Sequence, residues 1–520
     1  MKWLKSKAER LAAAVPELAP AAGRRDARLG ESRASAIAER LPRGVDVVRQ
    51  TMDRKESARW ARADEIARHG YRWNHLVLGK HAGQLIGAGD DKPMVTVASA
   101  RSGKTATVLK PSLYLYPGSM LVLDPKGELA ADTAEHRRMK LGQRVHVLDP
   151  FGCSGQASSS FDALAELDPD AASIVDDVDT ITQALILAEA GDDGSHWTNS
   201  AQALVRGLIL HALTLAREDR NLVTVRQLMM LTYGPLAQQR QKFEASGVND
   251  PDAAAQNALF LAMVAAGDAF GGALAGAGSS FLKKSDRERA NIVSTAETQM
   301  RFLDSMPLQA ISRRSDFKLA ELAERPTTVY LCLPSGKMES HFRWLRLIVR
   351  LALMALERRG TWPRGKPPIV LLMEEFATLG HMPIMEQAAA YFPGFGVKLW
   401  AVLQDLGQLQ RHYRQSWGTF LGNAGVLQFF GNGDKTTLDY ISDRLGSLSF
   451  VRGPFGMVGA GEDGGSRDYI DKERLIYPHE AAAAFARETG AQLLVFPGEP
   501  PMAVERLDFD EVERLKARRS

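Results

Sequence analysis

The chain has 520 residues, of which 45% are hydrophobic and 24% are charged. Single hydrophobic cores rarely grow past about 250–300 residues, so this length predicts two to four domains. The two cysteines, Cys153 and Cys332, stand far apart and outside any Cys/His cluster, which argues against a zinc site and fits a reducing compartment. No run approaches the about 18 consecutive apolar residues that cross a bilayer, and the first fifteen residues lack the apolar core of a signal peptide. We therefore expect a cytoplasmic protein.

Positive charge is concentrated at the start of the chain. Residues 1–73 hold 17 Lys and Arg against 10 Asp and Glu, a net of +7 in a chain whose overall net charge is +3. Prolines at 16, 20 and 42 interrupt the helical patterning, so we expect a helical arm with joints and a last helix at 54–69. A basic arm either binds an acidic partner or is a solvated helical surface, and both interpretations stay open.

Short β-prone runs alternate with helical stretches beyond the arm. The runs lie at 94–98, 120–123, 144–148, 327–333, 369–373, 397–403, 425–430 and 492–496. This alternation predicts an α/β fold with a sheet dominated by parallel strands. Residues 171–322 read almost entirely as helix, which indicates an all-helical insertion within the α/β core. A Gly-rich surface loop is predicted at 453–467.

A strand, a Gly-containing turn, Lys-Thr and a helix follow one another between residues 94 and 115. This order is typical of a P-loop, in which backbone N–H groups and a helix N-terminus surround phosphate. The positions predicted to bind nucleotide are Ala98, Ser99, Ala100, Arg101, Ser102, Gly103, Lys104 and Thr105. Lys104 is predicted to reach the β- and γ-phosphates of ATP, and the Thr105 hydroxyl to ligate Mg²⁺. Ala98 stands where the usual motif has Gly, a mild departure.

An apolar strand that ends in two carboxylates predicts a Walker B element at 369–376. We assign Glu374 to the Mg²⁺ ion and Glu375 to the polarisation of the attacking water. Most such motors have Asp at the first position, so the longer Glu374 departs from the pattern and predicts slow turnover as one outcome. The alternative is a strand end with two solvated acids.

A third apolar run, 397–403, ends at Gln404. In a RecA-like sheet the strand beside the Walker B strand ends near the γ-phosphate, where a polar side chain senses the nucleotide. Gln404 is the candidate for that role, with capping of the following helix as the alternative.

Several sequence blocks in one order resemble the type IV coupling proteins of conjugation and secretion systems, the TraG/VirD group. The blocks are SGKT at 102–105, LDPKGE at 123–128, VLDP at 147–150, STA at 294–296, SDF at 315–317, VYLCLP at 329–334, EEFATLG at 374–380, LQDLGQL at 403–409 and LLVFPGEPP at 493–501. The resemblance covers about residues 75–510. It implies a RecA-like P-loop NTPase core with an inserted all-α domain, ATP and Mg²⁺ as ligands, and a homo-oligomer, expected to be a hexamer, with nucleotide between subunits.

The resemblance also implies roles for further residues. Asp124, Lys126 and Glu128 match a family block near the expected site and are interpreted as interface residues or residues supporting the site, with a structural turn as the alternative. Arg444 is a weak candidate for the arginine that reaches across a subunit interface, since an exposed ion pair is the commoner role. Basic clusters at 283–287 and 313–314 either contact DNA phosphate or form a solvated face.

Together these features predict four segments: a basic arm at 1–73, a first part of the nucleotide-binding domain at 74–200, a helical domain at 201–322, and the second part at 323–520. The expected function is an ATP-hydrolysing coupling protein that passes DNA, a relaxase or an effector protein to a type IV secretion channel. Family members commonly begin with a transmembrane hairpin that is not seen here, so we expect peripheral contact with the inner membrane through a partner. The alternatives are a nucleotide-binding cargo receptor with little turnover, or an FtsK-like double-stranded DNA translocase.

Overall fold

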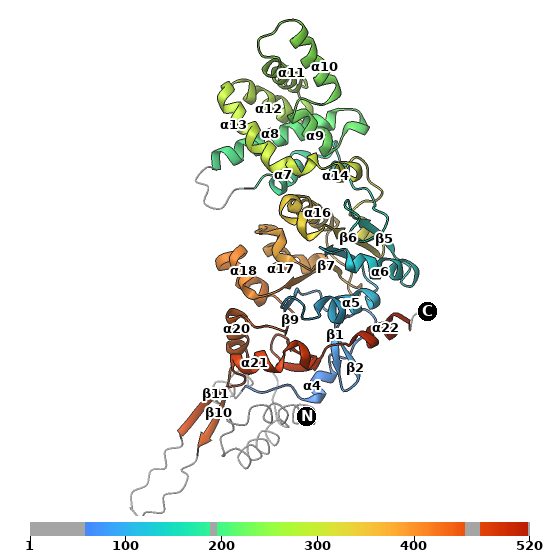
Figure 1. The fold of residues 1–520 in the computed structure, drawn as a ribbon, viewed down its shortest axis with the longest axis vertical. Coiled ribbons are helices and arrows are strands. Elements are labelled where there is room, and N and C mark those ends of the chain that lie inside the picture. The colour runs from blue at the N-terminus through green and yellow to red at the C-terminus, as the bar shows by residue number, and fades with distance from the viewer. Residues whose placement is uncertain (1–57, 188–194, 453–468, 518–520) are drawn as a thin grey trace, which may run out of the picture.

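A computed structural model describes residues 58–187, 195–452 and 469–517. The molecule is elongated (Figure 1), with a lobe of helices at one end, a large sheet in the middle, and a two-stranded ribbon that projects beside the opposite end. The ribbon is formed by β10 (Ser447–Arg452) and β11 (Tyr469–Arg474), which pair antiparallel. The predicted loop at 453–467 and most of the predicted arm, residues 1–57, lie outside the described residues.

The central sheet has eleven strands in the order β2–β1–β13–β12–β9–β3–β8–β7–β4–β6–β5. The seven strands from β9 to β5 all run parallel to one another. They are β3 (Met94–Ala98), β4 (Met120–Asp124), β5 (Arg144–Leu148), β6 (Thr327–Cys332), β7 (Ile369–Met373), β8 (Val397–Leu403) and β9 (Val426–Phe430). Each was predicted to within one residue at either end, and the parallel-dominated α/β fold is confirmed.

Four strands at one end of the sheet pair antiparallel: β1 (Leu76–His81), β2 (Gln84–Ala88), β12 (Ala491–Val495) and β13 (Met502–Glu505). Only β12 was predicted. Strands β1 and β2 are joined at Ala82 and Gly83, both with positive φ (49° and 80°), which is the backbone of a tight hairpin turn. The Ala-Gly pair at this turn is not the Asn-Gly or Asp-Gly signal by which a hairpin is found in a sequence.

A row of buried polar side chains joins the parallel and antiparallel parts. The Thr96 hydroxyl donates to Gln428 Oε1 at 2.8 Å, and Gln428 Nε2 donates to Gln492 Oε1 at 2.6 Å. Both glutamines also donate to the Leu78 carbonyl, at 3.2 and 2.6 Å. Since buried polar groups are costly when unpaired, this row favours one register for β1, β3, β9 and β12.

Both faces of the sheet are covered. On one face Met120 and Val122 of β4 pack with α5 (Lys110–Leu115) and α6 (Glu128–Met139). On the other face the apolar core continues without a break into the helical lobe. Buried on both faces, the central strands are mostly apolar, which explains why they were readily predicted. The remaining helices outside the lobe are α15 (Glu321–Glu324), α17 (Pro383–Ala390), α18 (Leu406–Tyr413), α19 (Trp417–Gly422), α20 (Lys435–Leu445), α21 (Pro478–Ala484) and α22 (Phe509–Ala517).

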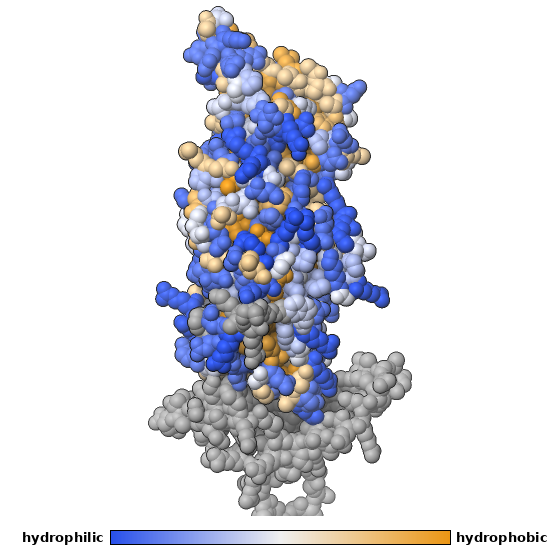
Figure 2. Space-filling view, turned by 90° about the vertical axis from the view of Figure 1, so that its right-hand side faces the viewer, coloured by the Kyte–Doolittle hydropathy of each residue, from blue (hydrophilic) through white to orange (hydrophobic). Residues whose placement is uncertain are grey.

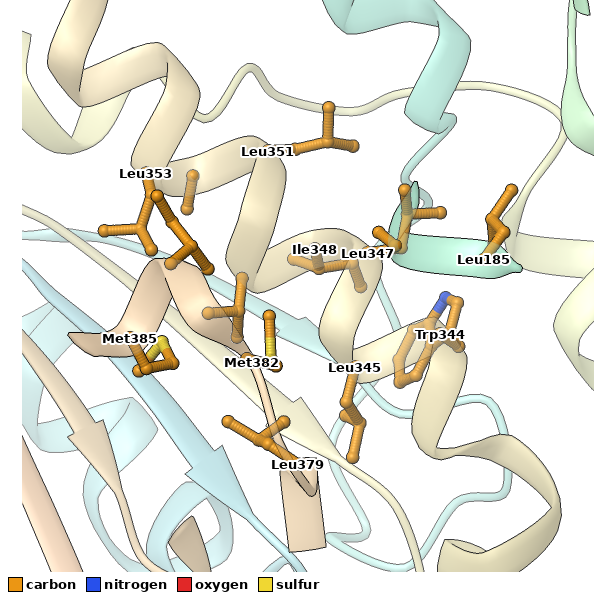
Figure 3. Packing of buried hydrophobic residues seen from close by; sticks show 14 of the residues in the cluster. Leu185, Trp344, Leu345, Leu347, Ile348, Leu351, Leu353, Leu379, Met382 and Met385 are labelled. Atoms are coloured by element: carbon orange, nitrogen blue, oxygen red, sulfur yellow. The ribbon is translucent and has the colours of Figure 1, made fainter. Parts of the chain in front are cut away.

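The lobe is helical, as expected for 171–322. Its helices are α7 (Ile174–Leu185), α8 (Ser195–Thr214), α9 (Leu222–Met229), α10 (Gly234–Ala245), α11 (Pro251–Ala265), α12 (Ala273–Leu282), α13 (Asp286–Met300) and α14 (Met306–Ile311). The long helix α16 (Met338–Arg359) lies between this lobe and the sheet. Figure 3 shows Trp344 and Leu347 of α16 on the side of Leu185 of α7, and Leu345 on the side of Leu379 and Met382. The exact domain boundaries at 73, 200 and 322 stay a prediction.

The helix expected at 54–69 is shorter than predicted. Within the described residues only α4 (Ala63–Ala67) is helical there. The Ala58 N–H donates to the Ser447 carbonyl and the Ala61 N–H to the Pro501 carbonyl, at 3.0 and 2.9 Å. These long-range backbone bonds hold the preceding segment in a non-helical form.

The surface of the described residues is mostly hydrophilic, with smaller apolar areas (Figure 2). The most exposed large apolar side chains include Met306, Tyr391 and Leu261. None of the helices in the described part of the chain combines the length and apolar character needed to cross a membrane.

Candidate functional site

The three predicted motifs meet at one edge of the sheet. Strand β8 pairs with β3 on one side and with β7 on the other, and all three run parallel. Their carboxyl ends therefore lie side by side, which is where open α/β sheets bind ligands. The predicted P-loop follows β3, Gln404 follows β8, and Glu374 and Glu375 follow β7.

The loop after β3 has the backbone of a tight phosphate-type turn. Arg101 and Gly103 both have positive φ, 60° and 92°, and Ser102 N–H donates to the Ser99 carbonyl at 3.2 Å. A single π-helical turn, Thr105–Leu109, follows directly, and such turns often occur at functional sites. For Arg101 this conformation is uncommon and is characteristic of strained functional loops.

Two distant residues hold this loop from the side of β9. A Cβ atom on Gly431 would lie only 2.6 Å from Ser102 Cβ, so this close approach requires glycine. From the C-terminal part of the chain, the Arg506 guanidinium donates to the carbonyl oxygens of Ser102 and Arg487. The Arg506 contact was not predicted, because an isolated arginine near the end of a sequence carries no motif.

Thr105 and Glu374 are in direct contact. The Thr105 hydroxyl donates to Glu374 Oε1 at 2.7 Å. Burial raises the pKa of Glu374 to about 7, opposed in part by the Thr105 hydrogen bond, while the charge of Asp124 raises it further. These two oxygen-bearing side chains were the predicted Mg²⁺ ligands, and the structure brings them together.

Lys104, Glu375 and Gln404 form a second group beside the first. Lys104 Nζ lies 3.4 Å from Glu375 Oε1. Gln404 Nε2 donates to both carboxylate oxygens of Glu375, at 3.2 and 3.3 Å. The alternative in which Gln404 caps the next helix is not observed, since Asp405 is the N-cap of α18 and accepts from Gln408 N–H.

The structure buries Asp124 but leaves Lys126 and Glu128 exposed. Asp124 is fully buried at the end of β4, where its Oδ2 accepts from Ala130 N–H at 2.8 Å. Burial raises the pKa of Asp124 to about 6. Lys126 and Glu128 are both exposed and 3.9 Å apart. Asp124 therefore lies within electrostatic reach of Glu374, whereas Lys126 and Glu128 face outward. Arg444 is also exposed, on α20.

A cavity of 290 Å³ lies against the P-loop on the side of β9, away from Glu374. It is lined by Ala100, Arg101, Ser102, Gly431, Asn432, Gly433, Ala482, Ala486, Arg487 and Glu488. Ser102 Oγ and Asn432 Nδ2 are buried and have no hydrogen-bond partner among the described residues. Buried polar atoms normally have hydrogen-bond partners, so these two atoms make the cavity a candidate place for a bound ligand. The GNGD run at 431–434 was the available sequence signal and was missed.

The donor set fits nucleotide with Mg²⁺ better than a protein-only metal site. Across the described residues there is no group of three or more His, Cys, Asp or Glu able to hold a metal by themselves. Mg²⁺ is usually bound through one or two protein ligands together with the phosphates of its substrate. Thr105 and Glu374 provide that number of oxygen ligands next to the phosphate loop.

A family model described as "Type IV secretory system Conjugative DNA transfer" matches residues 50–520. The chain belongs to this family. Members similar to it include "Conjugal transfer protein TraG" of Escherichia coli, 24% identical over 433 residues, and "Type IV secretion system-coupling protein VirD4" of Bartonella henselae, 22% identical over 435 residues. The alignments cover 76% and 82% of this chain, and the chain spans only 65% and 64% of the length of those relatives.

Solved structures show the same fold. The bacterial conjugative coupling protein TrwB, in its unbound form, has a TM-score of 0.63 at 15% identity, covering 87% of this chain and 93% of TrwB. TrwB in complex with ADP and Mg²⁺ has a TM-score of 0.62 at 14% identity, covering 86% of this chain and 93% of that one. These matches confirm the RecA-like P-loop NTPase fold that the sequence predicted.

Proposed function

We propose that this chain hydrolyses ATP and uses the resulting conformational change to pass cargo to a type IV secretion channel. The observation that carries the proposal is the meeting of Thr105 with Glu374, and of Lys104 with Gln404 around Glu375, at the carboxyl ends of three adjacent strands. The family assignment and the TrwB complex with ADP and Mg²⁺ support the same reading.

In this proposal each residue has one task. Lys104 binds the β- and γ-phosphates and stabilises the charge that develops on them. Glu375 accepts a hydrogen bond from the attacking water and polarises it, while Gln404, bonded to the same carboxylate, orients Glu375 and the water. Thr105 and Glu374 hold Mg²⁺, which when bound neutralises phosphate charge.

The residues on the two sides of the phosphate loop favour one orientation of the nucleotide. The groups that act on the γ-phosphate lie toward β8 and β7, so the base and ribose extend the other way, toward β9. The 290 Å³ cavity lies there, with Ser102 Oγ and Asn432 Nδ2 available as polar partners. The cavity size suits a purine nucleoside.

Partners follow from the family and are part of the same proposal. We expect DNA, a relaxase or an effector protein as cargo, contact with type IV secretion channel components, and a homo-oligomer, in which a hexamer would place exposed Arg444, Lys126 and Glu128 at subunit contacts. A cytoplasmic location at the inner membrane, with contact through a partner, is expected for a subunit of this kind.

Steady-state ATP hydrolysis by the full chain, with and without single- and double-stranded DNA, tests the proposal. We expect turnover stimulated by DNA, lost in Lys104→Ala with little change in thermal stability. In Glu375→Gln we expect hydrolysis to fall about 10²–10⁴-fold with nucleotide affinity retained, since a positioned general base contributes that much. Lys435→Ala, a change of an exposed lysine on α20, is the control and keeps wild-type rates.

The other outcomes choose between the alternatives. Nucleotide binding without turnover under any condition would favour a receptor that scarcely hydrolyses ATP, and Glu374→Asp would then be the first reversion to examine. Processive movement on free double-stranded DNA without secretion partners would favour the FtsK-like translocase.

A further inference from the structure

A second cavity, of 200 Å³, lies between the helical lobe and the segment that follows Glu375. Three helices contribute to it: α7 of the lobe, α16, and the start of α17. Its lining residues are Thr180, Gln183, Ala184, Arg346, Arg350, Met382, Pro383, Ile384 and Gln387. The lining holds two arginines and no carboxylate, so its electrostatic potential favours an anion.

Arg346 links this cavity to the nucleotide site. Its Nη1 donates to the carbonyl of Leu379 and, at 2.8 Å, to the carbonyl of His381. These carbonyls belong to the segment that leads away from Glu374 and Glu375. Figure 3 shows this same segment, at Leu379 and Met382, packed under α16, whose opposite side faces Leu185 of α7. The cavity therefore touches both the lobe and the loop that positions the carboxylates.

The positive charge in this cavity is poorly compensated. Arg346 is only 5% exposed, and its Nε has no hydrogen-bond partner among the described residues. Burial lowers the pKa of Arg346 to about 10, and burial likewise lowers the pKa of Arg350. Both remain cationic at neutral pH. In the part of the chain that the structure describes, Arg350 forms no ion pair or hydrogen bond, although Glu357 acts on it through its charge.

Three carboxylates near the cavity form contacts with other residues. Asp179 of α7 pairs with Arg206 at 3.3 Å, and Asp177 pairs with Arg358. Glu386 accepts from Ser416 at 2.9 Å. Helix α17 adds to the excess of positive charge in the cavity, since its first turn lines the cavity and no side chain caps it. The partial positive charge of that helix end acts in the same direction as the two arginines.

We infer that this cavity binds a phosphate group, either a free phosphate ion or the phosphate of a small organic ligand. The Arg346 and Arg350 guanidinium groups are the charged donors, and the amide groups of Gln183 and Gln387 complete a polar rim around the anion. The apolar side formed by Met382 and Ile384 accommodates the remainder of an organic phosphate. A ligand bound here bridges α7 and α17, so that it ties the lobe to the loop behind Glu375.

Calorimetric titration of the full chain carrying Lys104→Ala tests the inference, because that change weakens phosphate binding at the P-loop. The probes are orthophosphate and ribose 5-phosphate, each up to about 10 mM, a range that covers weak small-ligand affinities. We expect saturable binding, weakened at least about tenfold by adding Arg350→Gln, since a charge-assisted hydrogen bond contributes that much. The matched control is Arg359→Gln, which removes an exposed arginine from the same helix and leaves affinity unchanged.

A second variant separates binding from folding. Ala184→Leu fills the cavity from α7 without removing charge, and we expect it also to abolish binding. Tighter binding of ribose 5-phosphate than of orthophosphate identifies an organic phosphate, and equal affinities identify the free ion. Binding that is unchanged in Arg350→Gln, or no binding in the Lys104→Ala parent, overturns the inference. The readout needs no ATP hydrolysis, so it is independent of the proposed function.

Discussion

The edge of the sheet that holds the candidate site and the helical lobe differ in how far apart in the sequence their contacting residues lie. At the edge, the contacts join residues far apart in the chain: Thr105 and Glu374 are 269 positions apart, and Lys104 and Glu375 are 271. In the lobe, successive helices pack on one another through apolar side chains, as Phe260 of α11 does on Phe281 of α12, with ring centroids 5.3 Å apart. The site at the sheet edge therefore depends on contacts across the whole chain, whereas contacts within the lobe are largely between neighbouring helices, although its apolar side chains belong to the same core as one face of the sheet.

The largest effect is expected from breaking the lobe alone. Phe281 is 2% exposed, and Phe281→Ala removes a buried ring, which typically costs about 3–5 kcal/mol of unfolding free energy. We expect amide hydrogen exchange to speed up in α11 and α12 while nucleotide affinity changes less than twofold. Leu261→Ala, at an exposed position of α11, serves as control and should stay within about 0.5 kcal/mol. If nucleotide affinity falls together with lobe stability, the two regions are not separate.

A smaller effect is expected from one polar contact at the edge. Gln404→Leu keeps the approximate size of the side chain but removes both hydrogen bonds to Glu375. Hydrogen bonds to charged groups contribute about 1.5–3 kcal/mol, so we expect the hydrolysis rate to fall about 10–100-fold with nucleotide affinity retained. Rate and affinity are measured separately by single-turnover kinetics and equilibrium titration. A loss of affinity with an unchanged rate would contradict the assignment of Gln404 to the water.

The smallest effect is expected on the pH dependence of the stability of the ligand-free protein. Because the pKa of Glu374 is about 7 in the fold against an ordinary 4.5, the folded state retains a proton that the unfolded chain releases. This group's contribution to stability is full below pH 4.5 and is lost as pH rises through 7. We expect Glu374→Gln to be more stable than wild type at pH 8, by at most about 3 kcal/mol, and equal to it near pH 4.5. Thermal unfolding without nucleotide, at both pH values, measures the difference, and a variant less stable at pH 8 would show that burial is not the cause.

The sequence predicted the parts of the fold whose strands are mostly apolar. Strands such as β3 and β7 are buried on both faces, and their residues form nearly continuous apolar runs that end at a recognisable polar motif. Strands β1, β2 and β13 were missed because they carry polar or glycine residues, and β1 and β13 also depend on pairing with each other across more than 400 residues.

Many residues of the candidate site were also predicted from the sequence. Thr105, Glu374, Glu375 and Gln404 were predicted as a group, and the structure places them in contact, although their roles await experiment. The side of the site toward β9 was not predicted: the GNGD run that holds Asn432 was missed, and Arg506 carries no motif and meets the loop only through the tertiary fold. Arg346 and Arg350 likewise belong to no motif, and their burial follows from the packing of α7 and α17.

The contact between Arg506 and Ser102 can form only late in translation. The two residues are 404 positions apart, and β9, which flanks the loop, is also completed late in the chain. At about 5–20 residues per second, a ribosome needs about 20–80 s to travel from one to the other. During that interval the phosphate loop has been synthesised but lacks its neighbours, so the nascent chain cannot hold nucleotide as the finished protein does. The surroundings of the phosphate loop are therefore completed only when almost the entire polypeptide has been made.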